Sequence, residues 1–71
     1  MGNIRERLHA LGKTQTWMIL RLKERNMTVQ TSEFSYILSG VMTTPKAKRV
    51  LQMCDEILTE YENEVESNGT N

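Results

Sequence analysis

The sequence predicts an all-α fold, a compact single domain of four, or four to five, helices. Apolar residues recur at the spacing of a helix face through most of the chain, and no segment shows the apolar–polar alternation of a strand. Residues suited to helix caps precede the periodic stretches. With 71 residues, 38% of them hydrophobic, the chain can form one small domain with a thin core. We expect this domain over residues 1–66 and a disordered tail over residues 67–71.

The first helix is predicted within "NIRERLHAL". Ile4, Leu8 and Leu11 share one face of it. Asn3 is suited to the N-cap, and Gly12 ends the stretch. This helix therefore has one apolar face for the core.

The second helix should begin at "KTQTW", with Thr14 as its N-cap, and continue through the charged "KERN". Asn26 then supplies a left-handed stop, because asparagine tolerates that backbone conformation better than most residues do. Trp17, Ile19 and Leu20 make this helix apolar on more than one side. We therefore expect at least two neighbouring elements to cover it.

The third helix should begin at Gln30 or the residue after it. Val29 and Phe34 have the spacing of a hydrophobic staple around an N-cap at Gln30, and Glu33 can reach back to the cap. Gly40 closes the helix, and "VMTT" forms the connection to the next one.

The fourth helix is predicted to be the longest, with Thr44 as N-cap and Pro45 at its first position. Cys54 is the only cysteine and lies within its apolar pattern, so we expect a buried, reduced thiol rather than a reactive one. Its broad apolar stripe contains Val50, Leu51, Cys54, Ile57, Leu58 and Tyr61.

The net charge of zero hides an asymmetry along the chain. Residues 1–49 carry all nine basic side chains and three acidic ones, whereas residues 50–71 carry six acidic ones. The halves thus hold +6 and −6, which indicates a basic body that can face a polyanion and an acidic segment that points elsewhere or only aids solubility. No apolar run is long enough for a signal peptide or a membrane span, so a cytoplasmic protein without a membrane partner is expected.

Two short helices, the second with a small polar face, are typical of the helix-turn-helix that contacts DNA. The stretch "TVQTSEFSYILSG" has such a face, without lysine or arginine. The segments "LGKTQTWM", "VQTSEFSYILSG" and "TPKAKRVL" resemble the lambda-repressor and Cro-type, or XRE-type, regulators of phages and mobile elements, over roughly residues 3–58. The resemblance implies a lambda-repressor-like domain that binds a double-stranded DNA operator and regulates transcription.

The resemblance further implies that the third helix enters the major groove, with Thr31, Ser32 and Tyr36 at base edges and Ser35 nearby. Hydroxyl groups can donate or accept hydrogen bonds, and short side chains let a helix sit deep in the groove. Glu33 could accept from a cytosine amine, but its position favours the capping role.

Phosphate contacts are expected at the starts of the second and fourth helices, where free N–H groups attract anions. Gln15 matches the glutamine that binds a backbone phosphate in the family, and Trp17 should mainly pack, with its edge near the DNA backbone. The alternative for each cation is a merely solvated side chain. The residues expected at phosphates are Lys13, Gln15, Arg21, Thr43, Thr44 and Lys46.

Two departures from the family pattern stand out. Between Leu22 and Phe34 the chain is about five residues longer than the tight version of the motif. Ile19 occupies a place where a small residue usually lets the two helices approach closely. The chain resembles the long-turn variant of the family, which implies that an extra helical turn through "KERN" absorbs the added length.

A homodimer through the last helix is also predicted, with two recognition helices about 34 Å apart on a roughly palindromic operator. The alternative is that the same residues complete the core of the monomer. The residues at alternating a and d positions are Leu51, Cys54, Leu58, Tyr61 and Val65.

A small protein-binding inhibitor or antirepressor on the same scaffold is the alternative function, since a helical fold alone does not decide function. An enzyme is not expected, because the sequence offers one histidine, no glycine-rich phosphate loop and no supported Ser/His/Asp set. We expect no cofactor and no metal site.

Overall fold

The computed structural model describes the backbone of residues 3–69 and the side chains of residues 3–64. Within these residues it consists of four helices, α1 (Ile4–Ala10), α2 (Gln15–Glu24), α3 (Thr31–Ser39) and α4 (Pro45–Gly69), and the described backbone contains no strand. The predicted all-α fold of four helices is confirmed.

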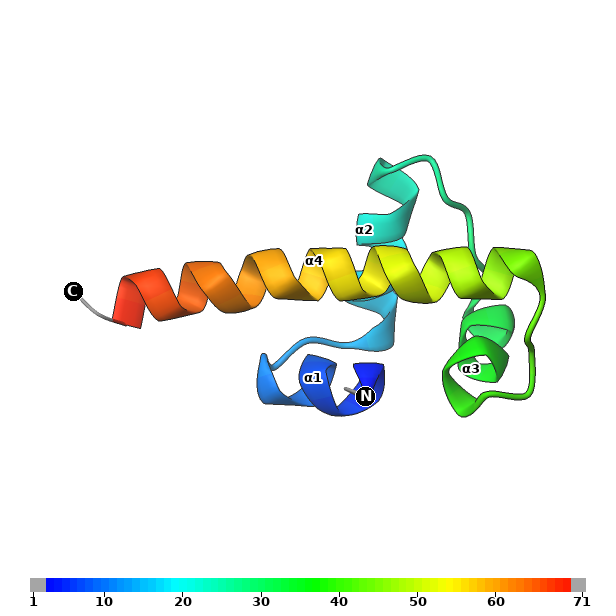
Figure 1. Ribbon diagram of the computed structural model, residues 1–71, viewed down its shortest axis with the longest axis horizontal. Helices are drawn as coiled ribbons and strands as arrows, with labels where there is room; N and C mark the ends of the chain where they lie inside the picture. The colour runs from blue at the N-terminus through cyan, green and yellow to red at the C-terminus, as the bar shows by residue number, and fades with distance from the viewer. Residues whose placement is uncertain (1–2, 70–71) are drawn as a thin grey trace.

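Helix α4 runs along the longest axis of the molecule (Figure 1). The three shorter helices each pack against it, and α2 also packs against α3. The C-terminal end of α4, orange to red in Figure 1, extends beyond the other helices, which gives the protein its extents of 41 × 24 × 18 Å. The N-terminal half of α4 therefore closes the core, and its other end projects from the body.

The predicted caps form in all four helices. Asn3 accepts hydrogen bonds from two N–H groups of the first turn of α1, at 2.9 and 3.4 Å. Thr14 and Thr44 each accept one at 3.1 Å from the third residue of the helix that they begin. In α3 the contact runs the other way, because the Gln30 N–H donates to the Glu33 carboxylate at 3.4 Å. Each cap satisfies a backbone group that the helix itself leaves free.

The connection between α2 and α3 differs from its prediction. Asn26 does adopt the left-handed conformation expected of it, with φ of 65°. However, α2 ends at Glu24, so only the first half of "KERN" is helical and residues 27–30 are non-helical. The reason is tertiary, since this path lets the Val29 side chain enter the core, where it is 4% exposed.

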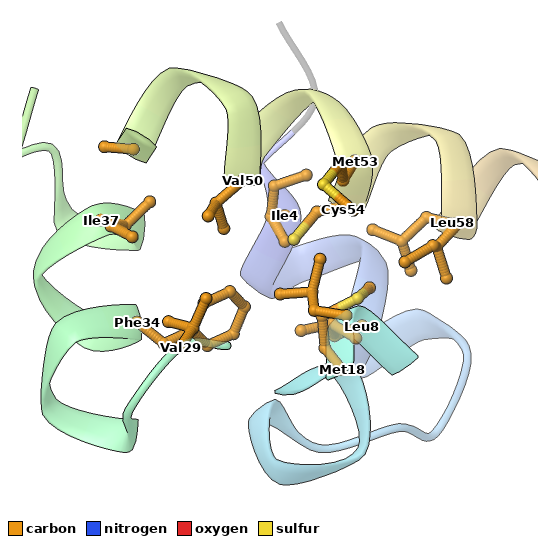
Figure 2. Packing of buried hydrophobic residues seen from close by; sticks show 13 residues of the cluster. Ile4, Leu8, Met18, Val29, Phe34, Ile37, Val50, Met53, Cys54 and Leu58 are labelled. Carbon is orange, nitrogen blue, oxygen red and sulfur yellow. The ribbon is translucent and has the colours of Figure 1, made fainter. Parts of the chain in front are cut away.

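All four helices contribute to one core, shown in Figure 2. Phe34 of α3 and Met18 of α2 are fully buried beneath Val50 and Cys54 of α4. Burial in apolar surroundings raises the pKa of the Cys54 thiol to about 12, so it stays protonated and poorly nucleophilic, as predicted.

Two further expectations concern the ends and the environment of the chain. Helix α4 continues past residue 66, where the domain was expected to end, as far as Gly69. Residues 70 and 71 of the predicted tail lie outside the described residues. None of the described helices combines the length and the apolar character needed to cross a bilayer.

Candidate nucleic-acid interface

Helix α3 turns its hydroxyl groups outward. Phe34 and Ile37 bind its inner face to the core, with 0% and 1% of their surface exposed. The spacing of an α-helix then places Ser32, Ser35 and Tyr36 away from the inner face and Thr31 at the edge of the same surface. Thr31, Ser32 and Tyr36 are exposed, and Ser35 is half-buried. The residues predicted to contact bases thus share one surface.

The start of α2 lies against the middle of α3. The Ser35 hydroxyl donates to the Gln15 side-chain oxygen at 3.4 Å, and Gln15 is the first residue of α2. Arg5 of α1 approaches the same place, donating to the Ser35 backbone carbonyl at 3.5 Å. The free N–H groups that begin α2 therefore adjoin the exposed face of α3.

The start of α4 flanks α3 through an ion pair. The Lys46 ammonium lies 3.3 and 3.2 Å from the two carboxylate oxygens of Glu33. Glu33 therefore serves both Lys46 and the cap of α3. In the free protein the Lys46 charge is partly neutralised, and the exposed Thr43 and Thr44 lie just before it in the chain.

Lys13 and Arg21, both predicted at phosphates, lie beside aromatic rings in the free protein. The Lys13 ammonium lies 5.4 Å from the centre of the Trp17 ring and 6.0 Å from that of Tyr61. The Arg21 guanidinium lies 5.7 Å from the Trp17 ring and pairs with Glu24 at 2.9 Å. Cations over aromatic rings gain electrostatic stabilisation, so these side chains have structural roles in the free protein.

Two adjoining hollows connect α3 with the start of α4. The first, of about 360 Å³, is lined by Tyr36, the two threonines before α4, and the apolar Val41 and Met42. The second, of about 470 Å³, shares Tyr36 and Met42 and adds Ser32 and Lys46 among its lining residues. Five predicted DNA contacts thus gather here. Sequence reasoning treated Val41 and Met42 only as a connection, although two apolar residues directly after a helix-ending glycine were a usable signal.

The acidic side chains of α4 do not all point away from the basic body. Arg7 of α1 bonds Asp55 at 2.6 Å and Glu62 at 2.9 Å. The hydrogen bond from Arg7 holds the pKa of Glu62 below its ordinary range, and the bonds to Glu62 and Asp55 raise the pKa of Arg7. The expectation of two separate charged regions therefore holds only in part.

Arg25, at the end of α2, binds the same helix from another side. Its guanidinium lies 2.8 Å from Glu60 and 4.0 Å from Glu56. The hydrogen bond to Glu60 raises the pKa of Arg25. Together with the contacts of Arg7, these pairs reduce the positive charge that the body can offer to a polyanion.

The predicted dimer interface needs correction at two positions. Cys54 and Leu58 are 0% exposed within the single chain, so they have no surface to offer a second copy. The cause is that α4 is covered by three helices at once. Leu51 and Tyr61 are half-buried, and the side chain of Val65 lies outside the described residues.

Comparison with protein-family models gave no match, and comparisons with curated proteins and with solved structures gave no significant match. Among the described residues no group of three or more His, Cys, Asp or Glu side chains is arranged to hold a metal ion.

Proposed function

We propose that this chain is a sequence-specific double-stranded DNA-binding regulator of the phage or mobile-element type, which contacts base edges in the major groove with α3. A cytoplasmic location belongs to this proposal. The observation that carries it is the exposed hydroxyl face of α3, bordered by the starts of α2 and α4. Hydroxyl groups suit base edges, and helix starts suit the phosphates on either side.

The resemblance to XRE-type regulators supports the same function, since Thr31, Ser32 and Tyr36, which match its base-contacting positions, are exposed on α3. A homodimer on a roughly palindromic operator is also part of the proposal, with Leu51 and Tyr61 as its remaining contacts on the described surface. Two binding sites on one operator would raise the specificity that weakly discriminating hydroxyl groups supply.

A protein-binding role on this scaffold is the second candidate. It is favoured by a hollow of about 570 Å³ between the start of α1, the end of α3 and the middle of α4. Ile4, Leu38 and Leu51 make much of its lining apolar, and of these only Leu51 has a part in the DNA-binding proposal, as a dimer contact. Apolar hollows of this kind accept side chains of partner proteins.

Selection from a random duplex library tests the first candidate. The protein is incubated with the library at low salt, bound DNA is recovered and amplified over several rounds, and the enriched duplexes are assayed by mobility shift against the starting library. We expect a common motif to be enriched and bound more tightly than random DNA. Absence of binding at low salt, or binding without any enriched motif, would reject sequence-specific recognition and favour the protein-binding candidate.

A further inference from the structure

The first hollow beside α3 is lined in part by two large apolar side chains that are mostly exposed. Val41, directly after the left-handed Gly40, is 74% exposed, and Tyr36 is 53% exposed. They are two of the three large apolar side chains that the described surface exposes, and both line the same hollow with Met42. Single exposed apolar residues need no explanation, but two that converge on one hollow indicate a contact.

The chemistry of α3 narrows what that contact can be. Residues 31–39 contain no Arg, Lys, Asn or Gln, the side chains that form paired hydrogen bonds with guanine or adenine. The only apolar group on the base edges of the major groove is the C5-methyl group of thymine. A DNA-binding face that combines hydroxyl groups with an apolar hollow is therefore suited to that methyl group.

We propose that the hollow lined by Tyr36, Val41 and Met42 is a subsite for the C5-methyl group of a pyrimidine in duplex DNA. The protein then prefers thymine where this hollow meets the groove. This inference rests on the proposed DNA-binding function and names the base feature that the site takes. The surroundings suit a neighbouring phosphate, because Thr43 and Thr44 line the hollow at the start of α4. The adjoining hollow is lined by Lys46, whose charge Glu33 partly neutralises in the free protein.

The test uses two alternating duplexes of equal length, one of adenine and thymine and one of adenine and uracil, which differ only in the methyl group. Binding is measured by fluorescence anisotropy at low salt. We expect the thymine duplex to bind more tightly by about fourfold for each methyl group buried. An alternating inosine–cytosine duplex should gain affinity in the same way when its cytosines carry 5-methyl groups.

Two variants separate the hollow from the shape of the duplex. Val41→Ser removes the most exposed of the three apolar lining side chains and should abolish the preference for thymine over uracil. Since Val41 is mostly exposed, the fold should survive, which circular dichroism verifies. Leu20→Ser, at an exposed apolar position of α2, is the matched control and should retain the preference.

The outcomes are distinct. Equal affinity of the wild type for both duplexes overturns the subsite and leaves DNA binding intact. A preference that persists in Val41→Ser arises from duplex shape and also overturns the subsite. Failure of the wild type to bind either duplex overturns the proposed function and the inference with it, and an apolar segment of a partner protein becomes the occupant to pursue.

Discussion

The rings of Trp17 and Tyr61 meet edge to face, with centroids 4.8 Å apart and planes inclined by 83°. Trp17 lies in the first turn of α2, and Tyr61 lies in α4, one turn after the buried Leu58. The Lys13 ammonium lies near both rings. This contact extends the packing of α4 past Leu58, the last fully buried residue among the described side chains.

Trp17→Ala should lower the free energy of unfolding by about 2–3 kcal/mol, somewhat less than the ~3–5 kcal/mol typical of a fully buried aromatic ring, because Trp17 is half-buried. In a domain of this size that corresponds to roughly 10–20 °C in Tm. Thermal melts followed by far-ultraviolet circular dichroism measure it. Leu20→Ala, at an exposed neighbouring position, should melt close to the wild type. An unchanged melt for Trp17→Ala combined with weaker DNA binding would move Trp17 from packing to the contact surface.

Stability should decrease on the acid side because of Arg7 and Glu62. The guanidinium lowers the pKa of Glu62 from its ordinary value of 4.5. A carboxylate whose pKa is lower in the folded state stabilises the fold above its unfolded pKa, and the contribution is lost as the pH falls through the folded pKa. We expect Tm to be nearly constant from neutral pH to about 5 and to fall below about pH 4.5.

Arg7→Met should remove part of this acid-side decrease, because the interaction that lowers the pKa of Glu62 is then absent from the folded state. The measurement is Tm against pH by circular dichroism. Lys23→Met is the matched control, since Lys23 is exposed and forms no ion pair within the described residues. If Arg7→Met and the wild type lose the same Tm between neutral and acid pH, the pair does not contribute.

Substitutions on the two sides of the interface should have different effects on DNA binding. Ser32→Ala should reduce the preference for a selected duplex over random DNA by about 1 kcal/mol, or about fivefold, because it removes a contact to a base edge. Lys46→Ala should weaken binding to every sequence and reduce the salt slope by nearly one. Titrations at several salt concentrations distinguish the two. If Ser32→Ala weakens binding to selected and random DNA by the same factor, as Lys46→Ala does, then Ser32 does not contact a base edge and α3 is not in the groove.

Glu33→Gln should strengthen binding to random DNA several-fold. The carboxylate holds the Lys46 ammonium at 3.2 Å and adds a negative charge next to the expected phosphates. Its removal ends this competition for Lys46, so binding should tighten at each salt concentration. Glu64→Gln, exposed near the far end of α4, removes the same charge and should have little effect. The gain should disappear when Lys46→Ala is added, and a gain that survives this second change would show that Lys46 is not its source.

Leu58→Glu should unfold the monomer, because it buries a charge without a partner in a core with little stability in reserve. Leu51→Glu, at a half-buried position, should fold and disrupt the proposed dimer. Circular dichroism reports the fold, and sedimentation equilibrium at micromolar concentration reports the mass. If Leu58→Glu is folded and monomeric, Leu58 contributes to the dimer interface after all. A wild type that stays monomeric would end the dimer proposal.

The starts of the helices could be predicted closely from the sequence because caps are local. Asn3, Thr14 and Thr44 bond N–H groups two or three residues away, and Asn26 adopts its left-handed conformation within a turn. The path after Glu24 could not be predicted in this way, because it depends on a pocket for Val29 that other helices build. Helical periodicity likewise predicted which face of α3 is exposed.

The rest of the site depends on contacts between distant parts of the chain. Arg7 meets Glu62, 55 residues away, and Arg25 meets Glu60, 35 residues away, and no local pattern marks such pairs. The apolar stripe of α4 was visible, but a stripe does not reveal what covers it. The assignment of Cys54 and Leu58 to a dimer failed for this reason. DNA binding itself, and the roles of Ser32 and Tyr36 in it, stay predictions.

The orientation of α4 has a consequence for the electric field of the molecule. The opposite charges of residues 1–49 and 50–71 cancel in number but not in position, because α4 carries its acidic residues away from Lys46, Lys48 and Arg49 at its start. The neutral chain therefore has an electric dipole moment along its 41 Å axis, even after Arg7 and Arg25 are paired. Near a polyanion this dipole moment turns the α3 end of the protein toward the polyanion, and added salt weakens the torque. The direction of one helix can thus orient the approach before any side chain makes contact.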